Sequence, residues 1–131
     1  MNYSLAGWLN LLVLLIILGP YILNSLNRKY LKTKNKSFLN LVKILRKIHK
    51  PLGLVLIVLG ASHGYMALGG FRLHTGTLFY ISILITGSLG GAFHRLKKKI
   101  LFVWHRRMAL ITALLFLLHF FFPSALYYLL G

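Results

Sequence analysis

Four long apolar segments alternate with short polar segments along this chain of 131 residues. The apolar segments cover residues 5–26, about 47–68, about 75–93 and about 100–122. Each is close in length to the ~20 residues with which an α-helix crosses the ~30 Å hydrocarbon layer of a bilayer. The pattern therefore predicts an all-α integral membrane four-helix bundle, formed as a single transmembrane domain over residues 1–131.

A different helical repeat precedes the second span. In residues 37–48 the apolar positions are 38, 41, 42, 45 and 48, with basic and amide side chains on another face. This spacing predicts a short amphipathic helix that lies on the cytoplasmic membrane surface before the chain turns into the span. Its basic face would bind anionic lipid or, alternatively, an acidic cytoplasmic partner.

The charges are strongly one-sided, because the chain has 16 Lys and Arg residues and no Asp or Glu. Nine of them lie between residues 28 and 50, six lie between residues 95 and 107, and the remaining one is Arg72. The positive-inside rule makes the two basic regions cytoplasmic, so both termini are expected outside a multi-pass protein of the cell (inner) membrane. The second and fourth spans then run in the same direction.

Composition excludes several classes of function. The chain has no cysteine, so disulfides, iron–sulfur clusters, thiolate haem ligation and covalent haem attachment are excluded within it. With 58% hydrophobic residues in long runs, its basic character does not indicate a nucleic-acid-binding module. Residues 5–26 lack a preceding basic region and a following small-residue cleavage pattern, which favours a membrane span over a signal peptide.

Two histidine pairs share one spacing within this apolar background. His49 and His63 belong to the second span, His105 and His119 to the fourth, and thirteen residues separate the members of each pair. Fourteen helical steps of ~100° end about 40° short of four full turns, roughly 21 Å along the axis, so both members face nearly the same way. Two parallel spans carrying such pairs would hold two non-covalent b-type haems, one above the other.

Haem iron is the interpretation that best accounts for buried histidines here. An ionisable side chain inside a membrane is costly unless it is paired or bound, and this chain has no carboxylate to pair with it. Histidines that are only hydrogen-bonded between helices would not require a matched spacing, and zinc and di-iron bundle sites commonly use the carboxylates that are missing. Pro51 leaves His49 the least secure of the four ligands, because it perturbs the helix around it.

Glycines give a second, weaker signal. Gly76 and Gly90 in the third span are also fourteen residues apart, and small residues let a backbone approach a flat macrocycle closely. Ordinary packing of small residues between membrane helices is the alternative explanation.

Together these residues resemble a minimal four-helix transmembrane di-haem b-type cytochrome. The His-x13-His pairs are similar to those on the haem-binding helices of the cytochrome b subunit in quinol-oxidising bc complexes, and ferric-reductase-like transmembrane domains stack two haems similarly. The resemblance implies that His49 and His105 bind the inner iron, that His63 and His119 bind the outer iron, and that Gly76 and Gly90 face the haems. The N-out topology departs from the bc-complex subunit, and the later helices and quinone-site segment of that family are absent, so its quinol chemistry does not transfer.

Three other residues are candidates for supporting roles. His74 and His94 lie at the two ends of the third span, where an interfacial histidine needs no special function. His94 is an alternative inner ligand in place of His49, and His74 is an alternative proton acceptor at an outer site. Arg106, beside His105, is a candidate for binding a haem propionate, although cytoplasmic anchoring explains it equally well.

The expected function is transmembrane electron transfer through two stacked bis-histidine haems. No nucleotide-binding loop or acidic general base is present, so the donor and acceptor must be external, either a redox partner subunit or quinone. The leading hypothesis is the membrane subunit of a larger oxidoreductase. The alternatives are a stand-alone membrane oxidoreductase that exchanges electrons between quinone and oxygen, superoxide or ferric iron, and a haem-free small transporter or assembly factor. Direction of transfer and oligomeric state stay open.

Overall fold

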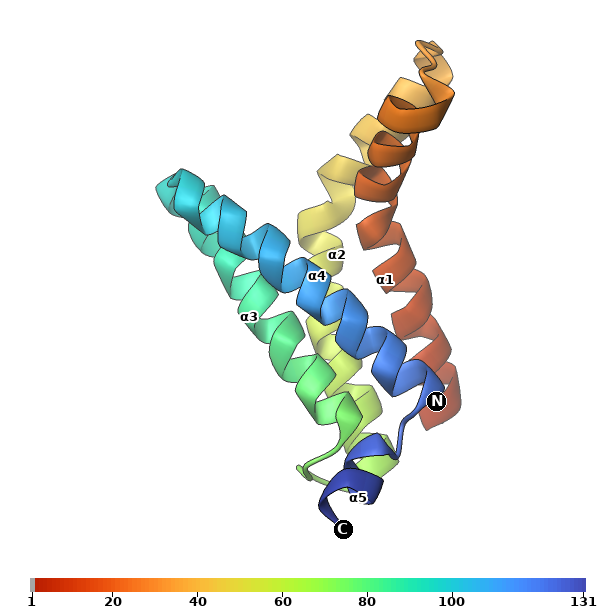
Figure 1. Cartoon of the computed structure of the whole chain (residues 1–131), viewed down its shortest axis with the longest axis vertical. Coiled ribbons are helices and arrows are strands. Elements are labelled where there is room, and N and C mark those ends of the chain that lie inside the picture. The colour runs from red at the N-terminus through yellow and green to blue at the C-terminus, as the bar shows by residue number, and fades with distance from the viewer. Residues whose placement is uncertain (1) are drawn as a thin grey trace. The chain divides into compact units, whose positions relative to one another are not determined.

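The computed structural model describes residues 2–131 and shows helices joined by short connections, with no strand among those residues (Figure 1). The elements in chain order are α1 (Tyr3–Leu26), a π-helical turn η1 (Asn27–Leu31), α2 (Lys36–Leu68), α3 (Thr75–Leu96), α4 (Lys99–Phe121) and α5 (Ala125–Leu130). The all-α fold predicted from the apolar pattern is confirmed. The short helix α5 was not expected.

Four of these helices are long and apolar enough to cross a membrane. They span 29 residues for α1 with η1, then 33, 22 and 23 residues for α2, α3 and α4. Most large apolar side chains of residues 2–131 are exposed, and only six hydrophobic residues are buried. A water-soluble protein rarely exposes so large an apolar surface, whereas lipid solvates it. The protein is a multi-pass membrane protein, and the side on which its termini lie stays a prediction.

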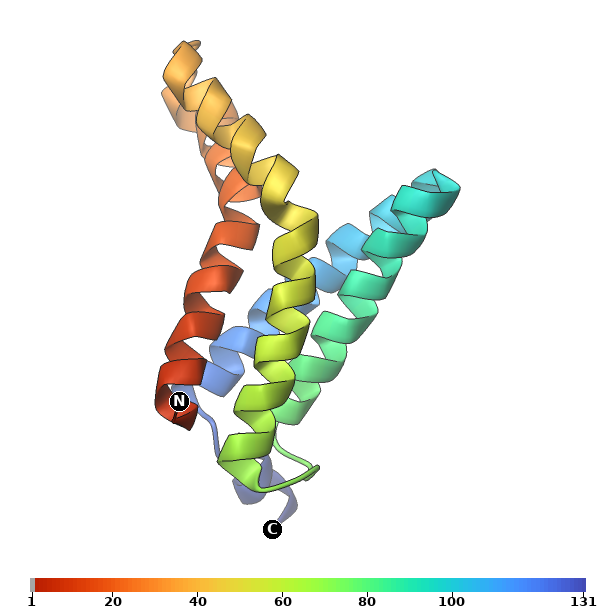
Figure 2. The same ribbon diagram turned by 180° about the vertical axis from the view of Figure 1, so that it is seen from behind.

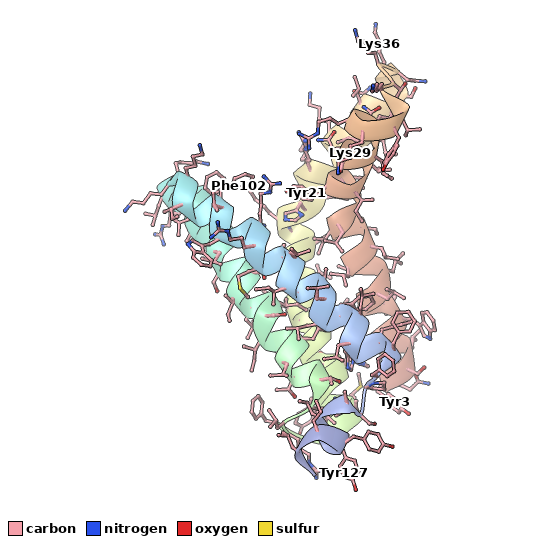
Figure 3. The ribbon with its side chains drawn as sticks, viewed as in Figure 1. Tyr3, Tyr21, Lys29, Lys36, Phe102 and Tyr127 are labelled. Atoms are coloured by element: carbon pink, nitrogen blue, oxygen red, sulfur yellow. The ribbon has the colours of Figure 1, made fainter. Side chains whose placement is uncertain are left out.

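The described residues divide into two compact units, one ending at Gly60 and one covering Ala61–Gly131. In the first unit, α1 and the N-terminal part of α2 run antiparallel and side by side (Figures 1 and 2). The labelled Lys29 and Lys36 lie at the connecting end of this hairpin, and Tyr3 lies at the opposite end (Figure 3). The two helices contact through polar groups: Asn10 Nδ2 donates to the carbonyl oxygen of Leu59 at 3.1 Å.

Helix α2 differs from the expectation of a separate interfacial helix over residues 37–48. The structure has one continuous helix, Lys36–Leu68, with Pro51 inside it. Proline removes a single backbone hydrogen bond, the one to the carbonyl of Lys47, and the rest of the ladder continues on both sides. At 1.5 Å per residue the 33-residue helix is about 50 Å long, which exceeds the hydrocarbon thickness. Residues 37–48 therefore belong to the same helix as the span, and their position at the membrane surface stays a prediction.

In the second unit, α3 and α4 form an antiparallel hairpin and lie side by side along their length (Figures 1 and 2). Helix α3 begins after His74, whose side chain caps the helix, and ends at Lys97 in the left-handed conformation, with φ of 58°. A hydrogen bond of 2.9 Å between the hydroxyls of Thr86 and Thr112 joins the two helices. The last turns of α2, from Ala61 to Leu68, belong to the same unit.

Candidate functional site

Two glycines of α3 accommodate the two histidine rings of α4. A Cβ atom at Gly76 would lie 2.9 Å from Cε1 of His119, and one at Gly90 would lie 2.9 Å from both Cε1 and Nδ1 of His105. Real Cβ atoms essentially never approach another atom this closely, so only glycine permits these ring positions. The fourteen-residue step between the glycines on α3 matches the fourteen-residue step between the histidines on α4.

This arrangement gives the glycine spacing a physical role that differs from the expected one. The sequence suggested that Gly76 and Gly90 make room for a flat macrocycle. In the structure, each glycine makes room for an imidazole of the neighbouring helix. The glycines thus act on the candidate ligands themselves.

Phenylalanine pairs accompany both glycine–histidine contacts. The rings of Phe79 and Phe116 have centroids 5.6 Å apart, and those of Phe93 and Phe102 are 5.1 Å apart. On α3 each phenylalanine follows its glycine by three residues, and on α4 each precedes its histidine by three. Sequence reasoning missed these phenylalanines, although the repeated Gly-x-x-Phe and Phe-x-x-His patterns contained the signal.

His119 has its ring held by a hydroxyl. Oγ1 of Thr75 lies 3.1 Å from Nδ1 of His119, and the same hydroxyl donates its hydrogen to the carbonyl oxygen of Pro123 at 2.7 Å. A hydroxyl has one hydrogen, so toward His119 it acts as the acceptor and Nδ1 carries the proton. In a neutral imidazole with this tautomer, the lone pair lies on Nε2, which is the nitrogen available to a metal.

His105 and His49 show the same protonation pattern. Nδ1 of His105 donates to the carbonyl oxygen of Thr86 at 2.8 Å. In the first unit, Nδ1 of His49 donates to the carbonyl oxygen of Ile17 at 3.2 Å, and Tyr21 packs against the ring edge with centroids 5.5 Å apart. A carbonyl oxygen can only accept, so the proton again lies on Nδ1 and the lone pair on Nε2. Metal-binding histidines commonly have their second nitrogen oriented in this way.

The two histidines outside the repeat show the opposite pattern. The backbone N–H of Gly76 donates to Nδ1 of His74 at 3.2 Å, which makes His74 the N-cap of α3. The ammonium of Lys97 lies 3.4 Å from Nδ1 of His94 and can only donate. In both residues Nδ1 is therefore the acceptor. His74 has a local structural role, and His94 is an exposed residue in the last turn of α3.

His63 and His119 meet at one end of the second unit. Their ring centroids are 6.4 Å apart with planes at 70°, and His119 also lies near His74 and stacks on Phe79. Metal–imidazole bonds of about 2.1 Å place the centroids of two rings on opposite sides of one ion roughly 6 Å apart. The 6.4 Å between His63 and His119 agrees with that requirement, and so does the 5.8 Å between His74 and His119.

The other expected pair divides between the units, since His49 lies in the first and His105 in the second. Their common feature is the donation from Nδ1 to a backbone carbonyl described above. Arg106 is exposed, and its guanidinium lies 5.9 Å from the ring centroid of Phe102. Arg107 lies 5.1 Å from the ring centroid of Trp104. Both arginines thus pack their charged groups over aromatic faces of their own helix.

Residues 2–131 contain no group of three or more histidine, cysteine or acidic side chains that could hold a metal ion. Haem has a different requirement, because the porphyrin supplies four nitrogens and the protein supplies one or two axial ligands. The donor set found here has no carboxylate, and the Nδ1 atoms of His49, His105 and His119 are engaged in hydrogen bonds, which fits that requirement.

These observations define an all-α multi-pass membrane protein with a repeated histidine site in its α3–α4 hairpin. In comparisons with protein-family models, curated proteins and solved structures, no match to this chain was found.

Proposed function

We propose that this protein transfers electrons across a membrane through two b-type haems, each bound by two histidines. His63 and His119 would bind one iron, and His49 and His105 would bind the other. We further propose that the chain is the membrane subunit of a larger oxidoreductase, because it carries no group of its own that would serve as an electron donor or terminal acceptor.

The main support for the proposal is the surroundings of His119. Its ring rests on Gly76, its Nδ1 donates to Thr75, and the ring of His63 lies at 6.4 Å. Each contact is what an axial ligand requires: a defined ring position, a defined tautomer and a second imidazole at the separation that one ion needs. A histidine that served only to join helices would not need all three of these features together.

The chain supplies position and environment. Haem, when bound, undergoes reversible one-electron exchange at its iron. Two histidine ligands for each iron would leave no position for an exogenous ligand, which suits electron transfer. Helix α4 is continuous between His105 and His119, so their backbones lie about 21 Å apart along its axis. Apolar helices and lipid around a haem would lower the local dielectric.

The basic residues complement the anionic groups that haem would bring. The chain has no Asp or Glu, so none of its 16 Lys and Arg residues can form an ion pair with an acidic side chain of the same chain. Haem propionates are carboxylates, which guanidinium groups bind well. Arg106 directly follows His105 in helix α4. Binding of a propionate by Arg106 is part of the proposal.

A spectrum of the purified full-length chain tests the proposal directly. We expect a reduced b-type α-band and a ratio of two haems per chain. His63→Ala combined with His119→Ala should leave one haem, and His49→Ala combined with His105→Ala should leave the other. His94→Ala is the matched control, because it removes an exposed histidine outside the repeat, and it should retain both haems.

Three results would contradict the proposal or part of it. Absence of the α-band in wild-type protein produced with adequate haem supply would favour a haem-free transporter or assembly factor. Retention of two haems in the His63→Ala, His119→Ala variant would show that other residues bind the iron. Turnover of quinol with oxygen, superoxide or ferric iron by the purified chain alone would instead indicate a stand-alone oxidoreductase.

A further inference from the structure

Thr75 occupies an unusual position at the start of α3. It is the first residue of the helix and only 1% exposed, and its hydroxyl contacts two segments that are distant in sequence. One contact is with Nδ1 of His119 in α4, at 3.1 Å, and the other is with the carbonyl of Pro123, just after α4, at 2.7 Å. The hydroxyl thus links the beginning of α3 to the end of α4.

The direction of these hydrogen bonds is determined by chemistry. The carbonyl of Pro123 can only accept, so it takes the single hydrogen of the Thr75 hydroxyl. The oxygen of Thr75 is then left to accept the proton on Nδ1 of His119. Because donation to Pro123 polarises the hydroxyl, its oxygen becomes a better acceptor for the imidazole.

His119 differs in this respect from the other two oriented histidines. His49 and His105 donate to backbone carbonyls, which no side-chain substitution removes. His119 donates to a side chain, so its hydrogen bond can be deleted by a single substitution at Thr75. We infer that Thr75 is a positioning residue that fixes the ring of His119 and tunes the haem iron that His119 would bind, an inference that rests on the proposed function.

The expected electronic effect follows from the acceptor role. An acceptor at Nδ1 raises the basicity of the imidazole, and a more basic axial ligand stabilises ferric over ferrous iron. Thr75 therefore lowers the reduction potential of one of the two haems. Thr75→Val removes the acceptor while keeping the branched shape of the side chain, so that potential should rise while the other stays unchanged.

The experiment is a spectroelectrochemical titration of the full-length chain with both haems bound. The wild type should titrate with two potentials. Thr75→Val should shift one of them upward and weaken retention of that haem by roughly tenfold or more, in line with losses of histidine-orienting partners elsewhere. Thr75→Ser keeps the hydroxyl and should restore the wild-type potential.

Thr77→Val is the matched control. Thr77 lies two residues further along α3 and is nearly as buried, and its hydroxyl donates to the carbonyl of Arg72. This variant removes a comparable buried hydroxyl whose hydrogen goes to the backbone, so it should leave both potentials unchanged. A role for Thr75 confined to supporting the start of α3 would not separate the two valine variants in this way.

The outcomes distinguish this inference from the proposed function. If the wild type binds no haem, the proposed function fails. If the wild type binds two haems but Thr75→Val leaves both potentials unchanged, or shifts them equally with Thr77→Val, the inference about Thr75 is overturned. If Thr75→Val loses one haem outright, retention by Thr75→Ser supports the inference, and loss of that haem from Thr75→Ser as well overturns it.

Discussion

The two helical hairpins of this protein hold their histidines in different ways. In the α3–α4 hairpin, a glycine of α3 lies against a histidine ring of α4, and beside it a phenylalanine of α3 contacts a phenylalanine of α4. This arrangement occurs twice along the two helices. In the α1–α2 hairpin, His49 donates to the carbonyl of Ile17 and Asn10 donates to the carbonyl of Leu59, and the glycine contacts described for this hairpin include no histidine ring. Proline lies inside both helices of this hairpin, at Pro20 and Pro51.

This difference shows two solutions to packing without a hydrophobic driving force. Lipid tails are as apolar as leucine, so membrane helices associate through close backbone approach or through hydrogen bonds between them. The α3–α4 hairpin combines hydrogen bonds between its helices with close approach at two glycines, which places its histidine rings at backbone distance from the next helix. In the α1–α2 hairpin, a Cβ atom at Gly19 would lie 3.5 Å from Cδ1 of Leu45, an ordinary van der Waals distance. Substitution of glycine by a larger residue should therefore affect the α3–α4 hairpin more strongly than the α1–α2 hairpin.

The largest expected effect comes from Gly90→Ala. The added methyl group would lie 2.9 Å from the ring of His105, so the ring must move. A side-chain ring can move without unfolding the helices, so we expect the variant to remain folded but to lose one of two haems. Absorbance at the reduced α-band, together with the haem-to-chain ratio, measures this.

Gly91→Ala is the control for that change. No atom lies within 4 Å of a Cβ built at Gly91, so the same substitution one residue later should preserve both haems. Equal haem loss in both variants would mean that alanine acts through the helix backbone, and the distinction between the two hairpins would not hold.

A smaller effect is expected from Asn10→Ala in the other hairpin. The side-chain amide of Asn10 donates to the carbonyls of Ala6 and Leu59, and only the second bond joins two helices. Its loss should lower the free energy of unfolding by about 1 kcal/mol, the size found for hydrogen bonds between membrane helices. Unfolding in mixed micelles, followed by circular dichroism, measures the change.

Burial of the Asn10 side chain also costs free energy, which opposes the benefit of its interhelical hydrogen bond. Its Oδ1 is buried and accepts no hydrogen bond among residues 2–131. An increase in stability on substitution would show that the cost of burying this oxygen exceeds the benefit of the interhelical bond. In that case polar contacts would not be what stabilises the α1–α2 hairpin.

A still smaller effect is expected from Arg106→Gln. The exposed guanidinium packs over Phe102, so its removal should change stability by less than about 1 kcal/mol. If Arg106 binds a propionate, the loss of a positive charge should lower the potential of one haem, because a nearby cation favours the reduced iron. Arg107→Gln is the comparison, and equal shifts in the two variants would argue against a specific propionate contact.

Thr86→Val should have the smallest effect on the haems. The hydroxyl of Thr86 contacts Thr112, but His105 donates to the backbone carbonyl of Thr86, which valine retains. Both potentials should therefore stay at their wild-type values in a redox titration. If Thr86→Val shifted a haem potential as much as Thr75→Val, the effect of Thr75→Val could not be attributed to loss of the side-chain acceptor of His119.

Much of the fold was predictable because lipid imposes a simple requirement on length and hydropathy. The expected spans lie within three residues of the observed helices at every end except the beginning of α2. There the change from apolar to amphipathic pattern suggested a break, and Pro51 strengthened that suggestion. The backbone ladder tolerates one missing hydrogen bond, so the helix continues from Lys36.

The candidate site was predictable in part, through the repeated spacing of its residues. The positions of Gly76 and Gly90 indicated a close approach, but which group approaches them depended on the register of α3 against α4. The contacts of Thr75 with distant segments could not be anticipated, because a threonine at a helix start usually has a local capping role. Its contacts with His119 and Pro123 join residues more than forty positions away.

The sequence by itself determined an all-α membrane protein, the approximate bounds of its spans apart from the beginning of α2, and a fourteen-residue histidine repeat, because hydropathy and helical periodicity act locally along the chain. Only the tertiary structure decided which ring nitrogens of His49, His105 and His119 carry the proton and which carry the lone pair. Those properties depend on whether the neighbour of Nδ1 donates or accepts, and that neighbour comes from a distant part of the chain for His49, His105 and His119. For His74 and His94 it is close in sequence, and those two histidines cap or flank their own helix.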